Sequence, residues 1–152
     1  MKIYTLRQEQ LVNRPRGEVF AFFARPENLQ VITPPWLGFV VLTPSPVRMK
    51  EGAVIDYTLR PMGLPMRWTS IITEYEAPLR FVDQQLIGPY SYWHHTHTFS
   101  ETRQGTLIVD EVRYIVPFGP IGRLAHALYV EGALDKIFDY RKSVIEKAFA
   151  VT

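Results

Sequence analysis

Two histidines on one strand are the residues in this sequence best suited to chemistry. They lie in the segment 81–99, FVDQQLIGPYSYWHHTHTF, where Gly88-Pro89 is a strong turn signal between two stretches rich in aromatic and β-branched residues. This pattern predicts a strand, a turn and a second strand. Because side chains alternate between faces along a strand, His95 and His97 share one face of the second arm, about 7 Å apart at their Cα atoms.

Two carboxylates are expected near these histidines. Asp83 lies on the first arm of the hairpin, and Asp110 lies on the next predicted strand. A carboxylate beside an imidazole raises its pKa and fixes its tautomer, so His95, His97 and Asp110 are the candidates for acid/base catalysis. Metal binding would need three or four such groups to converge on one point. A hydrogen-bonded network that orients side chains is the third interpretation.

The sequence lacks the motifs of other common catalytic and cofactor-binding sites. The sequence contains no Gly-x-Ser-x-Gly elbow, P-loop or dinucleotide fingerprint, and it has no cysteine to act as a nucleophile or thiolate ligand. We therefore predict no cofactor and no bound metal, and elemental analysis would test the latter. His94 faces the opposite side of its strand and His126 lies on a predicted helix, so both are treated as bystanders.

Aromatic residues accompany the polar ones on the same strand faces. Such a face suits the lining of a cavity, since small-molecule sites are largely apolar with a few placed polar groups. Plain core packing is the alternative for any single ring. The predicted ligand-binding residues are Tyr57, Trp68, Phe81, Asp83, Gln85, Trp93, His95, His97, Phe99, Asp110, Tyr114, Phe138 and Arg141.

Arg141 has two interpretations. It interrupts the apolar stripe of the last predicted helix and could bind an anionic ligand group through two N–H donors. It could equally pair with a carboxylate of the sheet, or cover apolar surface with its aliphatic stem while its head reaches water.

The elements that must position these residues begin with a strand at Ile3–Val12. Pro15 then starts a short helix, because proline suits the first turn. Pro26–Leu29 starts a second short helix that ends near Pro34. Two helices this early, before the remaining strands, favour an α+β layout.

The middle of the chain predicts strands joined by short links, which is typical of an antiparallel meander. Alternation places Ile55, Tyr57 and Leu59 on one face, and likewise Trp68, Ser70 and Ile72. Beyond the hairpin arms, the predicted strands are Trp36–Thr43, Val54–Arg60, Met66–Tyr75 and Thr106–Val116.

One long helix is predicted at Ile121–Phe149, about 43 Å in length at 1.5 Å per residue. Gly132 in its middle predicts a kink or the close approach of another group. The apolar stripe of this helix consists of Leu124, Leu128, Leu134, Phe138, Ile145 and Ala148. The fold predicted is α+β: a curved seven-stranded antiparallel sheet, two short helices after its first strand, and a long C-terminal helix over a cavity.

Two apolar loops, 61–66 and 117–121, carry glycine and proline. They are expected either to form a mobile rim around a cavity mouth or to be rigid turns whose methionine and phenylalanine side chains plug the core.

The order of elements, with Pro26-Glu27-Asn28-Leu29 near the front, resembles the SRPBCC or START-like superfamily, the helix-grip fold of pollen-allergen-like and polyketide cyclase-like proteins. The likeness covers nearly the whole chain. The segment 81–99, followed by Asp110-Glu111-Val112, is similar to a bacterial subgroup of ligand-binding SRPBCC proteins. The resemblance implies an internal hydrophobic cavity between the sheet and the last helix, and no particular ligand.

Composition fits this interpretation. A chain of 152 residues with 47% hydrophobic and 21% charged residues predicts one globular domain spanning 1–152. The net charge of +2 gives no sign of a nucleic-acid partner. The start MKIYTLRQEQ lacks the apolar core of a signal peptide, and no stretch is long enough for a membrane span. With no cysteine, we expect a cytoplasmic protein.

Three functions remain open from the sequence. The first is binding of a small hydrophobic ligand, lipid-like or aromatic, in the cavity. The alternative is an enzyme of the cyclase or hydrolase sort that uses His95 or His97 as a base. The third is an interaction module whose apolar loops or sheet edge contact another chain, for example in a homodimer.

Overall fold

The computed structural model describes residues 1–150. Strand β1 (Tyr4–Val12) is followed by helix α1 (Arg16–Phe23) and helix α2 (Leu29–Ile32). The helical turns η1 (Pro26–Asn28) and η2 (Pro35–Leu37) flank α2. Pro15 directly precedes α1, as expected for a residue with a fixed φ and no N–H.

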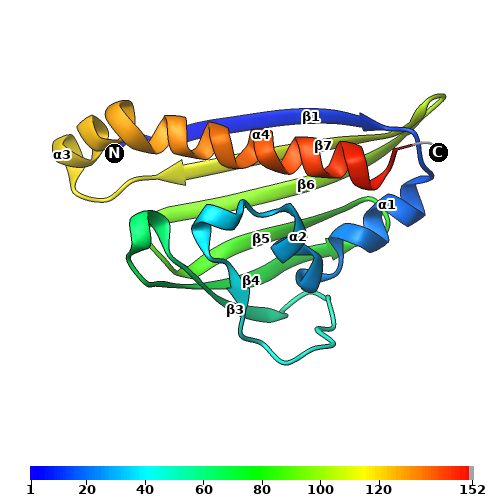
Figure 1. Ribbon diagram of the computed structural model, residues 1–152, viewed down its shortest axis with the longest axis horizontal. Helices are drawn as coiled ribbons and strands as arrows, with labels where there is room; N and C mark the ends of the chain where they lie inside the picture. Colours follow the sequence, from blue (N-terminus) through cyan, green and yellow to red (C-terminus); the bar gives the residue numbers. More distant parts are fainter. Residues whose placement is uncertain (151–152) are drawn as a thin grey trace.

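Seven antiparallel strands form one sheet, in the order β1-β7-β6-β5-β4-β3-β2. The first strand pairs with the last, from Tyr4 opposite Tyr114 to Val12 opposite Thr106, so β1 and β7 lie side by side (Figure 1). The remaining strands are β2 (Val40–Val41), β3 (Val54–Leu59), β4 (Met66–Glu76), β5 (Arg80–Ile87), β6 (Tyr92–Thr102) and β7 (Gly105–Ile115), with the turn η3 (Pro61–Gly63) between β3 and β4.

The C-terminal helical segment lies lengthwise along the sheet, with α2 packed beside it (Figure 1). It consists of α3 (Gly119–Ala125), a π-helical turn η4 (His126–Val130) and α4 (Glu131–Ala148). No helix within residues 1–150 has the length and apolar character needed to cross a membrane. The predicted fold class, α+β with a seven-stranded antiparallel sheet and a long C-terminal helix, is confirmed.

One end of the molecule is closed by aromatic packing. The ring of Phe20 on α1 meets the rings of Phe81 and Phe99 edge-on, with centroids 5.9 and 5.2 Å apart. Ile145 and Phe149, at the end of the C-terminal segment, belong to the same buried cluster. This cluster holds α1, the sheet and the end of α4 together.

The predicted strand faces are confirmed. Trp93, His95, His97 and Phe99 are all buried on one face of β6, whereas His94 on the other face is only half-buried. The inward face of β7 is buried in the same way, through Thr106, Ile108, Asp110, Val112 and Tyr114.

The predicted strand Trp36–Thr43 is largely wrong. Residues 35–37 form a 3₁₀ turn, Gly38 has φ of +56°, and only Val40–Val41 pairs with β3. Prolines on both sides of this segment have no N–H to donate to a ladder, which keeps the edge strand short.

The predicted helix is interrupted rather than regular. The π turn fits more residues into a turn than an α-helix does, so it changes which residues preceding it face the sheet. Leu124, which precedes the π turn, and Leu128, which lies within it, are exposed. Ala148 at the far end of α4 is exposed as well. At Gly132, just after the π turn, no atom lies within 4 Å of the place a Cβ would take, so close approach of another group is not its role.

Gly105 offers a test of the first strand pair. Its φ is +129°, and a Cβ there would overlap the carbonyl oxygen of Val12. We expect Gly105→Ala to lower the free energy of unfolding by about 2 kcal/mol or more, measured by urea denaturation. Gly17→Ala is the matched control, because a Cβ at this position of α1 meets nothing within 4 Å and should change stability by less than about 1 kcal/mol. Equal stability of the two variants would contradict the assigned pairing of β1 with β7.

Candidate functional site

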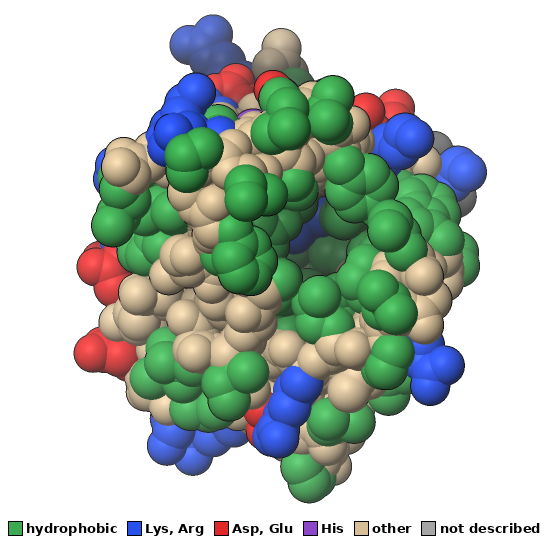
Figure 2. All heavy atoms as spheres, turned by 90° about the vertical axis from the view of Figure 1, so that its left-hand side faces the viewer, with side chains coloured by type: hydrophobic (Ala, Val, Ile, Leu, Met, Phe, Trp, Pro, Cys, Tyr) green, Lys and Arg blue, Asp and Glu red, His purple; other side chains and the backbone are tan. Residues whose placement is uncertain are grey.

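A cavity of about 1010 Å³ lies between the sheet and the helices. Its walls come from α2, η2, strands β3 to β6, and α3 to α4, and they are mostly apolar. Figure 2 shows its mouth as a hollow ringed by hydrophobic side chains, at the end of the molecule opposite the aromatic cluster. Apolar side chains of the wall include Leu29, Leu59, Met66, Val130, Leu134 and Ile137.

The two apolar loops form part of this mouth. Met62 and Phe118 both line the cavity, yet their side chains are 73% and 81% exposed, so they do not plug the core. Both have positive φ, 55° and 70°, a conformation that is uncommon for residues other than glycine. The rim interpretation of loops 61–66 and 117–121 is therefore the one the structure supports.

The polar groups lie deep in the cavity, where the strand register brings them together. Asp83 on β5 pairs with His95 on β6, and Asp110 on β7 pairs with His97. The Nε2 atom of His97 is 2.6 Å from Oδ2 of Asp83, and Nε2 of His95 is 2.8 Å from Oδ1 of Asp110. Each histidine also approaches the other aspartate, through Nδ1, at 3.2 Å for His97 and 3.7 Å for His95. The four side chains thus form a closed ring of alternating imidazoles and carboxylates.

Arg141 joins this ring from the helix. Its Nη2 donates to Oδ1 of Asp110 at 3.3 Å, and its guanidinium carbon lies 5.2 Å from the ring centre of Phe23 and 5.7 Å from that of Phe138. The side chain is 10% exposed, and this contact confirms the prediction of an ion pair with a sheet carboxylate. Arg141 also lines the cavity, which leaves a role toward a ligand open.

The two histidines differ in charge because their neighbours differ. Burial alone lowers the pKa of His97, but contacts with Asp110 and Asp83 outweigh it and raise that pKa above its ordinary value. Both nitrogens of His97 face carboxylates, which accept hydrogen bonds only, although the Nδ1 contact lacks hydrogen-bond geometry. Burial and the neighbouring His97 lower the pKa of His95. The two carboxylates beside His97 therefore favour its protonated form over that of His95, whose Nε2 faces Asp110.

Both carboxylates are ionised in this setting. Burial raises the pKa of Asp110, but Arg141 and the two histidines outweigh it and hold that pKa well below its usual range. The histidines have the same effect on the pKa of Asp83, which is also lowered despite its burial.

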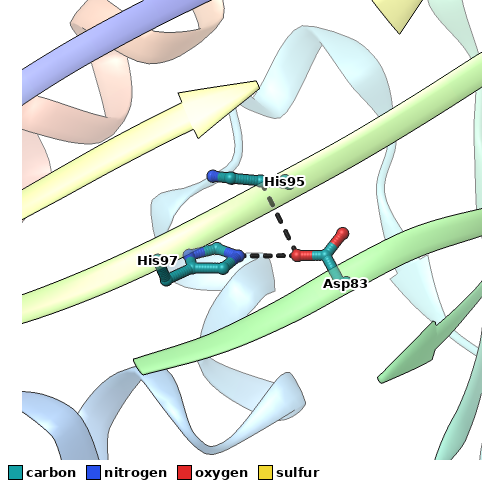
Figure 3. Close-up of side chains that lie close together, drawn as sticks. All are labelled: Asp83, His95 and His97. Carbon is teal, nitrogen blue, oxygen red and sulfur yellow. Dashed lines mark hydrogen bonds and ion pairs between the residues drawn. The ribbon is translucent and has the colours of Figure 1, made fainter. Parts of the chain in front are cut away.

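Metal binding is the interpretation that this geometry fits least. Asp83, His95 and His97 lie close together (Figure 3), and they offer ligand atoms within 4.8 Å of one another. However, the two imidazoles are stacked, with centroids 3.7 Å apart and planes 26° from parallel. Nitrogen lone pairs lie in the ring plane, so two nearly parallel rings cannot both direct them at one ion about 2.0–2.1 Å away.

Eight of the thirteen predicted ligand-binding residues line the cavity, and five do not. Those that line it are Tyr57, Trp68, Asp83, Trp93, His95, His97, Phe138 and Arg141. Among the rest, Asp110 belongs to the ring but does not border the cavity, and Phe81 and Phe99 pack in the aromatic cluster. Gln85 binds the backbone N–H and carbonyl of Tyr90, so it fixes the hairpin turn.

Two polar residues with buried contacts, Ser70 and His126, were not among the site residues predicted from the sequence. Ser70 binds the Tyr57 hydroxyl at 2.6 Å and accepts a hydrogen bond from the Trp68 indole at 3.0 Å, which fixes two aromatic rings of the wall. Its position between Trp68 and Ile72 on an inward face was the available signal.

His126, expected to be a bystander, is buried at the start of the π turn. Its Nε2 is 2.7 Å from the Tyr114 hydroxyl, and its ring stacks on Tyr4 with centroids 3.5 Å apart. It therefore anchors the helical segment to β1 and β7, outside the cavity wall. No sequence signal pointed to this contact, because it depends on how the π turn places the helix.

No protein-family model and no curated protein matches this sequence. Solved structures do match it, at low identity. Protein Ms6760 from Mycobacterium smegmatis is 16% identical with a TM-score of 0.72, over 97% of this chain and 91% of the other. An uncharacterized protein from Rhizobium leguminosarum is 16% identical with a TM-score of 0.70, over 96% of both chains. Protein TTHA0849 from Thermus thermophilus is 17% identical with a TM-score of 0.67, over 95% and 99%. These likenesses establish a shared fold.

The ring of His95, His97, Asp83 and Asp110 predicts a large loss of stability when one of its carboxylates is removed. Asp110→Asn keeps the shape of the side chain but leaves Arg141 and His97 without their shared anion. We expect the free energy of unfolding to fall by about 3 kcal/mol or more, measured by urea denaturation. Glu111→Gln is the control, since Glu111 lies on the outward face of the same strand in an exposed ion pair with Arg7, and it should cost less than about 1 kcal/mol. A cost for Asp110→Asn as small as that of the control would contradict a buried charged ring.

The charge on His97 predicts a pH dependence. Its raised pKa in the folded state stabilises the fold fully below the unfolded value of about 6.5, and this stabilisation is lost as pH rises through the folded value. We expect the stability advantage of the wild type over His97→Gln to shrink over that rise. Nitrogen-15 NMR of the imidazoles should show His97 protonated on both nitrogens near neutral pH and His95 neutral. A neutral His97 in that spectrum would refute the assignment.

Proposed function

We propose that this protein binds a small hydrophobic molecule in the cavity between the sheet and the C-terminal helix. The observation that carries the proposal is the combination of a large, mostly apolar void with a compact polar ring deep inside it. Ligand sites are generally of this kind, with volumes of roughly 300–1000 Å³. The apolar body of the ligand would contact the aromatic walls, and its polar end would meet the ring.

The resemblance to helix-grip SRPBCC proteins supports the same function. Members of that superfamily are expected to enclose hydrophobic ligands. The solved structures share this fold over nearly the whole chain and name no ligand. The exposed rim of Met62 and Phe118 would let an apolar molecule enter without crossing a polar barrier. A homodimer through the same rim would cover the mouth.

Binding is favoured over acid/base catalysis by the way the ring holds its protons. Each nitrogen of His97 faces a carboxylate, and His95 already donates to Asp110. A general base needs a free lone pair directed at its substrate. Only Nδ1 of His95 carries a lone pair in this arrangement, and it points toward Asp83 at 3.7 Å. The ring therefore suits orientation of a ligand better than proton abstraction from it.

A variant that fills the cavity tests this function. Ala133 lines the cavity from α4, so Ala133→Trp should occupy part of the void and weaken binding of the neutral dye Nile red by about 10-fold or more. The dye's fluorescence in titrations gives the affinity. Glu146→Trp is the control, because Glu146 is exposed on the same helix and away from the cavity, and it should bind like the wild type. Failure of the wild type to bind any apolar probe would overturn the proposed function.

A further inference from the structure

Arg141 keeps hydrogen-bond donors that the protein does not use. Its contact with Asp110 involves Nη2 alone, and its Nε is buried without a hydrogen-bond partner among residues 1–150. The side chain is 10% exposed and lines the cavity. A ligand cannot reach Nε, which has almost no accessible surface. Nη1 makes no hydrogen bond among the described residues and is not enclosed in this way, so an acceptor supplied by a ligand would stabilise it.

Asp83 offers the complementary acceptor. Within the described residues its contacts with His95 and His97 all use Oδ2, and both dashed lines in Figure 3 end on that one oxygen. The other oxygen, Oδ1, takes part in none of these contacts, and the side chain lines the cavity with 17% of its surface accessible. Donor and acceptor are thus both available to the polar end of a ligand.

The charges of the ring already cancel. Asp83 and Asp110 carry one negative charge each, and Arg141 and the doubly held His97 carry one positive charge each, with His95 neutral. Besides these groups, the described cavity wall has one charged residue, Lys136, which is exposed on α4. An added anion would therefore leave a net negative charge in a buried, largely apolar site, which is strongly unfavourable.

We propose that the cavity selects ligands whose polar end is an uncharged hydroxyl group, as in an apolar alcohol or phenol, over ligands that end in a carboxylate. The hydroxyl would donate its proton to Oδ1 of Asp83 and accept a hydrogen bond from Arg141. This inference rests on the proposed function, since it specifies the ligand class for the same cavity. A hydrocarbon without a head group would leave both protein groups unpaired, and a carboxylate would add the uncompensated charge.

Three probes with one apolar body test the selection: 1-pyrenebutanol, 1-pyrenebutyrate and 1-butylpyrene. Their affinities near neutral pH can be measured by calorimetry and by quenching of Trp68 and Trp93, which line the cavity. We expect the alcohol to bind at least about 10-fold more tightly than either of the others, because it alone satisfies both groups without adding charge. Equal or tighter binding of the butyrate would overturn the inference. Absence of binding by all three, butylpyrene included, would instead overturn the proposed function itself.

A charge-changing variant sharpens the test. Asp83→Asn removes one negative charge, while Asp110 still faces His97 and favours its charged form. The site becomes less unfavourable for an anion, so the ratio of butyrate to alcohol affinity should rise by about 10-fold. Glu111→Gln removes an outward-facing carboxylate and should leave the ratio unchanged. Retained binding of butylpyrene shows that Asp83→Asn keeps its cavity, and an unchanged ratio in such a protein would overturn the inference. If the variant does not fold, the wild-type ratios decide alone.

Discussion

The ion pair between Arg141 and Asp110 is the contact on which the arrangement of the molecule depends. It joins α4 to the middle of the sheet, where the side chains of Arg141 and Asp110 are only 10% and 7% exposed. Because a buried charge without its partner is costly, the pair fixes how the helix lies along β7. Asp110 in turn holds both histidines, so the same contact sets their orientation and separates their protonation states.

The two ends of the molecule use apolar residues in opposite ways. At one end Phe20, Phe99 and Ile145 fill the space between helix and sheet. At the other end residues of the same types, such as Leu134 and Phe118, face a void or solvent. Packing at the closed end contributes stability that the open end gives up, since side chains beside a void lose dispersion contacts. A cavity of this size is thus compatible with a folded domain.

Much of the fold was predictable because strand alternation is a local property. The period of two placed His95 and His97 on one face and Asp110 on a buried face of the next strand. The failures have equally physical reasons. The edge segment 36–43 lost most of its strand to neighbouring prolines and to a positive φ at Gly38, and the π turn changed which residues of the helix face the sheet.

The sequence by itself determined six of the seven strands, the faces of those strands and the types of group that meet on them. Tertiary structure decided which of these groups border the cavity. Phe99 and Trp93 share a strand face, yet Phe99 is packed by Phe20 from α1 whereas Trp93 lines the void. That difference depends on contacts between residues far apart in the chain. It also depends on how far along the sheet a helix stays in contact with it. A local pattern contains no information on either, because it repeats identically along filled and hollow stretches of the same strand.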